Sequence, residues 1–99
     1  MAIPFTTYSA QIGDGESLEF TRRSDDAIIG EMVFHVFVSG INGHSLALQF
    51  YCPTEATWVG TGDTALIVNG ETGYSGIADV EYRVLCTGGT GDVTVRVVV

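Results

Sequence analysis

The residues with the most reactive chemistry in this sequence are two histidines and two cysteines. His35 lies between apolar neighbours and His44 lies in a turn rich in Gly and Asn, and neither has further ligands at the spacing of a zinc site. A structural or surface role is therefore predicted for both histidines. Cys52 and Cys86 do not stand at the start of a helix, where a thiolate would be stabilised, so neither is predicted to be a catalytic nucleophile.

The two cysteines leave two structural alternatives open. In a reducing compartment they are expected to be small buried side chains with free thiols. If instead their strands faced each other across the fold, a disulfide would close a loop of about 34 residues and would add roughly 3 to 4 kcal/mol to stability.

Two short acidic segments, residues 13–16 and Asp25-Asp26, carry oxygens that could contact Ca²⁺. Neither has the alternating acidic spacing of a calcium loop, so both are predicted to be ordinary turns. The sequence also contains no phosphate-binding loop and no nucleophile-elbow motif. We therefore predict a protein that is not an enzyme and that has no catalytic residues, no metal site and no cofactor.

Aromatic side chains suggest a different kind of site, in which rings stack on a sugar. Tyr82 belongs to the inward set of its strand and is expected in the core, whereas Trp58 follows a polar stretch and is the best exposed candidate. Packing in a core or an interface is favoured for these rings over sugar binding. A carbohydrate-binding, lectin-like module stays the alternative function.

The charge of the chain excludes several partners. Twelve acidic and four basic residues give a net charge of −8, and lysine is absent. Nucleic acids and anionic membranes are therefore not expected to bind, because both need a basic patch. No stretch approaches the roughly 18 apolar residues of a membrane helix, and residues 1–7 do not resemble a secretory signal, so synthesis in a cytoplasm is expected.

The elements that would carry these residues are strands, because the apolar residues alternate along most of the chain. Strong strands are predicted at 32–38, 46–52, 80–86 and 93–99, and weaker ones at 6–12, 18–20, 57–59 and 65–68. The glycine-rich turns between them, among them 69–70 and 72–73, give about eight short strands in one domain over residues 1–99, which is typical of an all-β, antiparallel β-sandwich or jelly roll. Turn 87–92 predicts a hairpin that makes the last two strands neighbours. Only residues 24–30 hint at a helix.

Several strands have apolar residues on both faces, which is more than one small core can bury. The second face of 32–38 includes Phe37, and the second face of the last strand includes Val98. Arginines suit specific ion pairs at subunit contacts. We therefore expect a homo-oligomer, and the interface candidates are Trp58, Arg83, Arg96, Phe37 and Val98.

The second half of the chain resembles small β-sandwich virion proteins of tailed bacteriophages. The resemblance covers Leu46 to Val99. It consists of the strand Leu46-Ala47-Leu48-Gln49-Phe50, a polar loop ending in Thr57-Trp58-Val59, the strand Val80-Glu81-Tyr82-Arg83-Val84, the turn Thr87-Gly88-Gly89-Thr90-Gly91-Asp92 and the strand Val93-Thr94-Val95-Arg96-Val97. It implies a structural protein located in a virion, as a head decoration or cement protein or a head–tail accessory component. It also implies trimers and contacts with capsid or other virion proteins.

Overall fold

Eight strands and no helix are found in the part of the chain that the structure, a computed structural model, describes, which is residues 7–21 and 31–99. The strands are β1 (Thr7–Ile12), β2 (Ser17–Phe20), β3 (Glu31–Ser39), β4 (His44–Cys52), β5 (Thr57–Gly60), β6 (Gly70–Ile77), β7 (Tyr82–Gly88) and β8 (Val93–Val98). The predicted helical hint at 24–30, the pair Arg22-Arg23 and the acidic pair Asp25-Asp26 lie outside the described residues.

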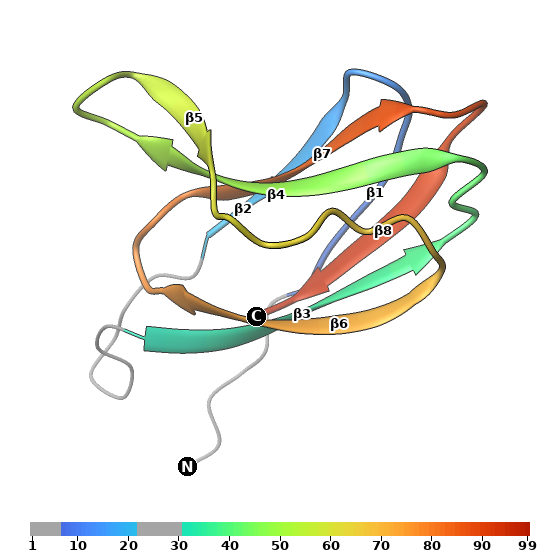
Figure 1. The fold of residues 1–99 in the computed structure, drawn as a ribbon. Helices are drawn as coiled ribbons and strands as arrows, with labels where there is room; N and C mark the ends of the chain where they lie inside the picture. The colour runs from blue at the N-terminus through green and yellow to red at the C-terminus, as the bar shows by residue number, and fades with distance from the viewer. Residues whose placement is uncertain (1–6, 22–30) are drawn as a thin grey trace, which may run out of the picture.

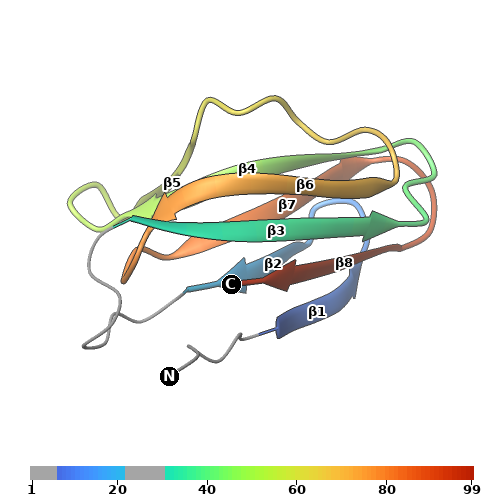
Figure 2. The ribbon, with the colours of Figure 1, turned by 90° about the horizontal axis from the view of Figure 1, so that it is seen from below.

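The strands form two antiparallel sheets that pack face to face, as Figure 1 shows. Sheet A has the order β1-β8-β3-β6 and sheet B has the order β2-β7-β4-β5. Figure 2 looks onto sheet A, with β6 at one edge and β1 at the other. The predicted all-β sandwich is confirmed.

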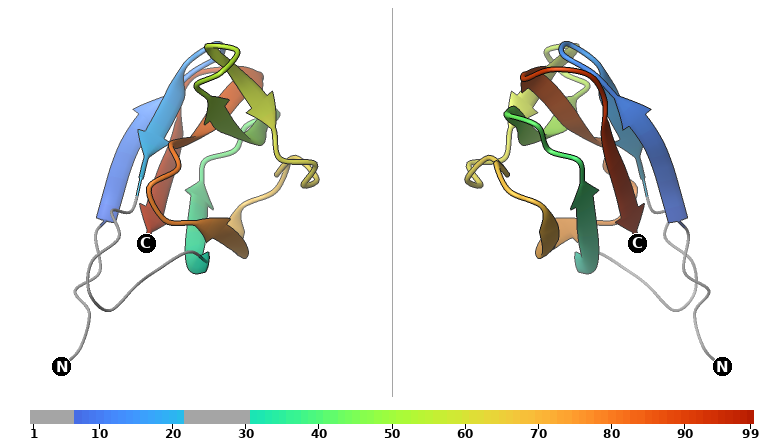
Figure 3. Two further views of the ribbon diagram at one scale, coloured as in Figure 1. Left: turned by 90° about the vertical axis from the view of Figure 1, so that its left-hand side faces the viewer. Right: turned by 90° about the vertical axis from the view of Figure 1, so that its right-hand side faces the viewer.

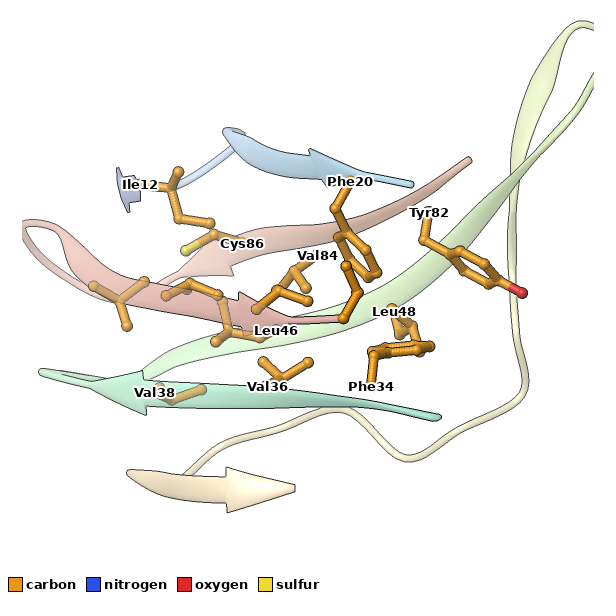
Figure 4. Close-up of a cluster of buried hydrophobic side chains, with 14 residues drawn as sticks. Ile12, Phe20, Phe34, Val36, Val38, Leu46, Leu48, Tyr82, Val84 and Cys86 are labelled. Atoms are coloured by element: carbon orange, nitrogen blue, oxygen red, sulfur yellow. The ribbon is translucent and has the colours of Figure 1, made fainter. Parts of the chain in front are cut away.

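The core lies between the sheets and follows the alternation of the sequence. Inward side chains of β3 and β8 in sheet A meet those of β4 and β7 in sheet B (Figure 4). The buried set includes Phe34, Val36, Val38, Leu46, Leu48, Tyr82, Val84, Cys86, Val93, Val95 and Val97. Because successive strand residues point to opposite faces, the same alternation turns the other half of each strand outward.

The predicted pairing of the last two strands is wrong. β7 lies in sheet B beside β2 and β4, whereas β8 lies in sheet A between β1 and β3. The turn after β7 therefore carries the chain from one sheet to the other. Each of the two strands has one fully apolar face. Because β7 and β8 lie in different sheets, these two faces meet across the core, whereas a hairpin within one sheet would place them side by side.

The strand predicted at 65–68 is also wrong, and a turn predicted at 72–73 lies inside a strand. Segment 61–69 connects the sheets and makes one isolated bridge, Leu46 with Leu66. The glycine-rich β6 is a strand because it pairs with β3 along its whole length. At Gly76 an added Cβ would stand 2.9 Å from Cε1 of Phe34 and 3.0 Å from the Tyr82 hydroxyl oxygen, so only glycine leaves room for these rings.

The two cysteines are free and far apart. Cys86 is opposite Leu46 in the β4–β7 register, so Cys52 lies six residues further along β4. At a rise of about 3.3 Å per residue this is roughly 20 Å, which is beyond the reach of a disulfide. The disulfide alternative therefore does not apply to this fold.

Candidate functional site

Two aromatic residues and two polar residues gather on the outer face of sheet B. They are Gln49 and Tyr51 on β4, Trp58 on β5 and Arg83 on β7, and we call them the Trp58 cluster. The register brings them together, since Tyr51 is opposite Trp58 and Gln49 is opposite Arg83.

The members of the Trp58 cluster hold one another in place. The guanidinium carbon of Arg83 lies 4.6 Å from the ring centroid of Trp58, which is a cation–π distance. The Nε of Arg83 donates a hydrogen bond of 2.7 Å to Oε1 of Gln49. The rings of Tyr51 and Trp58 meet edge to face, with centroids 5.4 Å apart and planes at 67°. All four side chains are half-buried, so the isolated chain already presents an ordered aromatic and polar patch.

The outer face of sheet A carries a second pair of the same type. Arg96 on β8 lies over the ring of Phe37 on β3, with its guanidinium carbon 5.6 Å from the ring centroid. Val98 is two residues along β8 and is opposite His35. Val33, on the same face, is 62% exposed and Phe37 is 37% exposed. We call the outer residues Val33, His35, Phe37, Arg96 and Val98 the Phe37 face.

The interface candidates predicted from the sequence thus divide between two opposite surfaces. Trp58 and Arg83 lie together on sheet B, whereas Phe37, Arg96 and Val98 lie together on sheet A. Sequence reasoning did not include Gln49 or Tyr51 among the interface candidates. The alternation had placed both on the outward set of their strand, but only the strand register reveals that they meet Arg83 and Trp58.

His35 forms a polar contact at the edge of the Phe37 face. Its Nδ1 contacts Oε1 of Glu71 on β6, and both side chains are about half exposed. The imidazole lies over Gly73, where an added Cβ would stand 3.3 Å from the ring carbon Cε1.

His44 and Cys86 form a buried pair near the start of β4 and the end of β7. His44 is 1% exposed and Cys86 is 0% exposed. The imidazole Nε2 lies 3.1 Å from the carbonyl oxygen of Thr90, and Nδ1 lies 3.1 Å from the sulfur of Cys86. A carbonyl can only accept, so Nε2 carries the hydrogen and the thiol donates to Nδ1.

The environment of Cys86 keeps its thiol protonated. Burial raises the pKa of Cys86, and the carboxylates of Asp14, Glu16 and Asp92 raise it further. A nucleophilic cysteine needs the opposite, namely a lowered pKa and access to substrate. The arrangement joins the 40–43 and 88–91 turns and has the properties of a structural contact.

The acidic turn at residues 13–16 uses its carboxylates to accept hydrogen bonds from backbone N–H groups. Oε1 of Glu16 accepts from the backbone N–H of Gly13 at 2.7 Å, and Oδ1 of Asp14 accepts from the N–H of Gly88 at 2.8 Å. Across residues 7–21 and 31–99, no three His, Cys, Asp or Glu side chains are arranged to hold a metal ion.

An open hollow of about 780 Å³ lies between β6 and the connection 61–69. Its apolar wall includes Phe50, Val80 and Tyr82, and its polar wall includes Thr61 and Asp63. Burial, and secondly the charge of Asp63, raise the pKa of nearby Tyr74.

Comparisons of the chain with known protein families, with curated proteins and with solved structures gave no match. In the ranges that the structure describes, no helix is long and apolar enough to span a bilayer.

Proposed function

We propose that this chain is a non-enzymatic structural protein of a bacteriophage virion that acts through oligomeric contacts between β-sandwiches. Its role would be to decorate or stabilise a capsid, or to serve as a head–tail accessory protein. The resemblance of Leu46 to Val99 to phage virion proteins supports the virion context and a trimer.

The observation that carries the interface part of the proposal is the arginine stacked on an aromatic ring on each outer face. Trp, Tyr and Arg are the residue types that most often dominate the binding energy of protein interfaces. The chain has four arginines and no lysine, and two of these arginines lie over Trp58 and Phe37. In an acidic chain, a stacked arginine also offers a fixed cation to a carboxylate of another copy.

The mutual contacts of the Trp58 cluster favour binding for an entropic reason. Ordering a flexible side chain at an interface costs roughly 0.5 to 1.5 kcal/mol. Arg83 and Trp58 are already restrained by their stacking and by the hydrogen bond to Gln49, so less of this free energy is lost on association.

Light scattering after size-exclusion chromatography tests the proposal. We expect a trimer whose mass is constant over a wide concentration range. The double variants Trp58→Ala/Arg83→Ala and Phe37→Ser/Arg96→Ala each remove one stacked pair. The variant that converts the oligomer to monomers identifies the surface that forms the subunit contact. A stable monomer of the unmodified chain would count against oligomeric contacts.

A matched control is available in the connection before β6. Ile67 and Val68 are 66% and 67% exposed, yet they lie on neither outer sheet face. The variant Ile67→Ser/Val68→Ser removes comparable exposed apolar surface, and it should leave the mass unchanged. If it dissociates the oligomer as well, general surface hydrophobicity drives association.

Carbohydrate binding is the second candidate function, and the Trp58 cluster is the observation that favours it. Two rings stand beside the amide of Gln49 and the guanidinium of Arg83, which together supply stacking surfaces and planar hydrogen-bonding groups. Arg83 already covers one face of the indole, so a sugar would stack on the other face. Glycan-array binding that is lost in Trp58→Ala and kept in Phe37→Ser would favour this function.

A further inference from the structure

β6 is the longest edge strand among the described residues. It has eight residues, whereas the other edge strands β1, β2 and β5 have six, four and four. β1 and β2 lie side by side and close one flank of the sandwich, as the end views in Figure 3 show. β6 contains no Lys, Arg or Pro, the residues that commonly protect an edge from pairing.

Three residues on the outer edge of β6 have backbone groups that no described backbone group outside β3 occupies. The N–H of Ile77 donates to the Tyr82 hydroxyl at 2.9 Å and its carbonyl accepts from the N–H of Val80, so Ile77 does not bond to β3. In an antiparallel ladder alternate residues face the same side, so the N–H and C=O groups of Glu71, Gly73 and Ser75 also point away from β3. No described residue outside β3 forms a backbone hydrogen bond with them.

The open hollow adjoins this edge. Ser75, Gly76 and Ile77 form one wall, and the connection 61–69 arches over the other side (Figure 2). In a strand added antiparallel to β6, the residue opposite Gly76 would turn its side chain inward, toward the hollow. The hollow beside Gly76 is lined by Val80 and Tyr82, against which an apolar group at that position would pack.

The charges beside this edge are negative. Asp63 is the charged side chain that lines the hollow, and Glu71 lies on the outer side of β6, where it contacts His35. Neither of the described arginines, Arg83 and Arg96, lines the hollow. The net charge of −8 adds a long-range field of the same sign, which attracts cations to this edge.

We infer that the edge of β6 binds an extended, positively charged peptide segment of a partner protein, by adding it as a fifth strand to sheet A. Its main chain bonds to Glu71, Gly73 and Ser75, an apolar side chain enters the hollow beside Gly76, and basic side chains on the other face of the added strand lie toward Glu71, while the charge of Asp63 adds attraction. Main-chain bonds supply affinity in such strand addition, and pockets for alternate side chains supply specificity. This edge adjoins the Phe37 face at Glu71 and includes none of the residues substituted to test the proposed function.

NMR titration of the ¹⁵N-labelled full chain with the blocked peptide Ac-Val-Arg-Val-Arg-Val-NH₂ tests the inference. We expect shifts of the Gly73 and Ser75 amides and protection of both from hydrogen exchange. A peptide with N-methylated arginines loses donors needed for strand pairing, and one with Glu in place of Arg reverses the charge; each should bind at least about tenfold more weakly.

Variants of the chain locate the site. Ser75→Pro removes one edge N–H and should weaken binding at least about tenfold, whereas Ser75→Ala keeps this N–H and should bind like the unmodified chain. Asp63→Asn, which does not alter the edge backbone, should weaken binding about threefold. Equal affinity for the N-methylated peptide, or shifts centred on the Trp58 cluster instead of β6, would overturn the inference.

Self-pairing of β6 edges is the competing outcome. It would appear in light scattering as a dimer that dissociates in Ser75→Pro and not in Ser75→Ala, and it would overturn the assignment to a basic partner. The proposed function is tested separately, because it depends on substitutions at Trp58, Arg83, Phe37 and Arg96, none of which should change peptide binding. A monomer that binds the peptide would reject the first proposal alone.

Discussion

The two histidines of this chain lie in opposite environments. His35 stands in an apolar run of the sequence, yet its side chain is 48% exposed and contacts Glu71 on the outer face of sheet A. His44 stands beside a glycine turn, yet it is 1% exposed and bonds to Cys86 and Thr90. The polarity of the neighbouring residues therefore did not decide burial. Alternation within the strand did, since His44 shares its face with Leu46 and Leu48, and His35 shares its face with Val33 and Phe37.

Replacing each histidine by alanine should give the largest contrast. His44→Ala leaves a cavity and removes hydrogen-bond partners from a buried thiol and a carbonyl, so the free energy of unfolding should fall by about 3 kcal/mol. His35→Ala should change it by less than about 0.5 kcal/mol, because the ring is half exposed. Urea unfolding followed by circular dichroism measures both. Similar losses for the two variants would contradict the assignment of His44 to the core.

The packing around His44 can be tested at a neighbouring glycine. At Gly89, with φ of 70°, an added Cβ would lie 2.6 Å from ring atoms of His44 and 2.7 Å from its backbone nitrogen. Gly91 has φ of 67° and open space around it, so Gly91→Ala carries the backbone strain without the clash. Gly89→Ala should therefore destabilise the fold by about 2 kcal/mol more than Gly91→Ala. Equal unfolding free energies would show that the turn moves freely away from His44.

The partner of His44 should make stability depend on alkaline pH. The pKa of Cys86 is raised in the folded chain by burial and by nearby carboxylates, so the unfolded chain loses this proton at a lower pH than the folded chain does. Stability should then fall as the pH rises above the pKa of the unfolded thiol, by at most about 1.4 kcal/mol per pH unit. Unfolding at pH 7.5 and 9.5 measures the loss. It should disappear in Cys86→Ala and persist in the control Cys52→Ala.

The smallest effect is expected at the exposed histidine. A double-mutant cycle of His35→Ala and Glu71→Ala should give a coupling free energy below about 0.5 kcal/mol, because water and salt screen an exposed pair. The cycle of His44→Ala and Cys86→Ala should give a larger coupling, since both partners are buried. Coupling energies in the reverse order would contradict the comparison.

The sequence predicted most strands and the core, because a period of two directly reports which side chains share a face. It failed at β6, where the pair Thr72-Gly73 was predicted to be a turn. Residues distant in the chain explain the glycines of β6, because His35 lies over Gly73 and the rings of Phe34 and Tyr82 leave no room for a side chain at Gly76. The candidate residues Trp58 and Arg83 were found from the sequence, but their contact depends on strand register, which local pattern does not encode.

The amino-acid sequence by itself determined that this chain forms a two-layered β fold with a net negative charge and apolar residues on both faces of β3, because alternation and composition are local properties. Only the tertiary structure decided which strands are neighbours, that Arg83 and Arg96 lie on different outer faces, which histidine is buried and which edge is left unpaired. These depend on contacts between residues far apart in the chain, such as His44 with Cys86 and Phe37 with Arg96. The crossing of β7 and β8 into different sheets follows from burying two apolar faces against each other, which no single strand specifies.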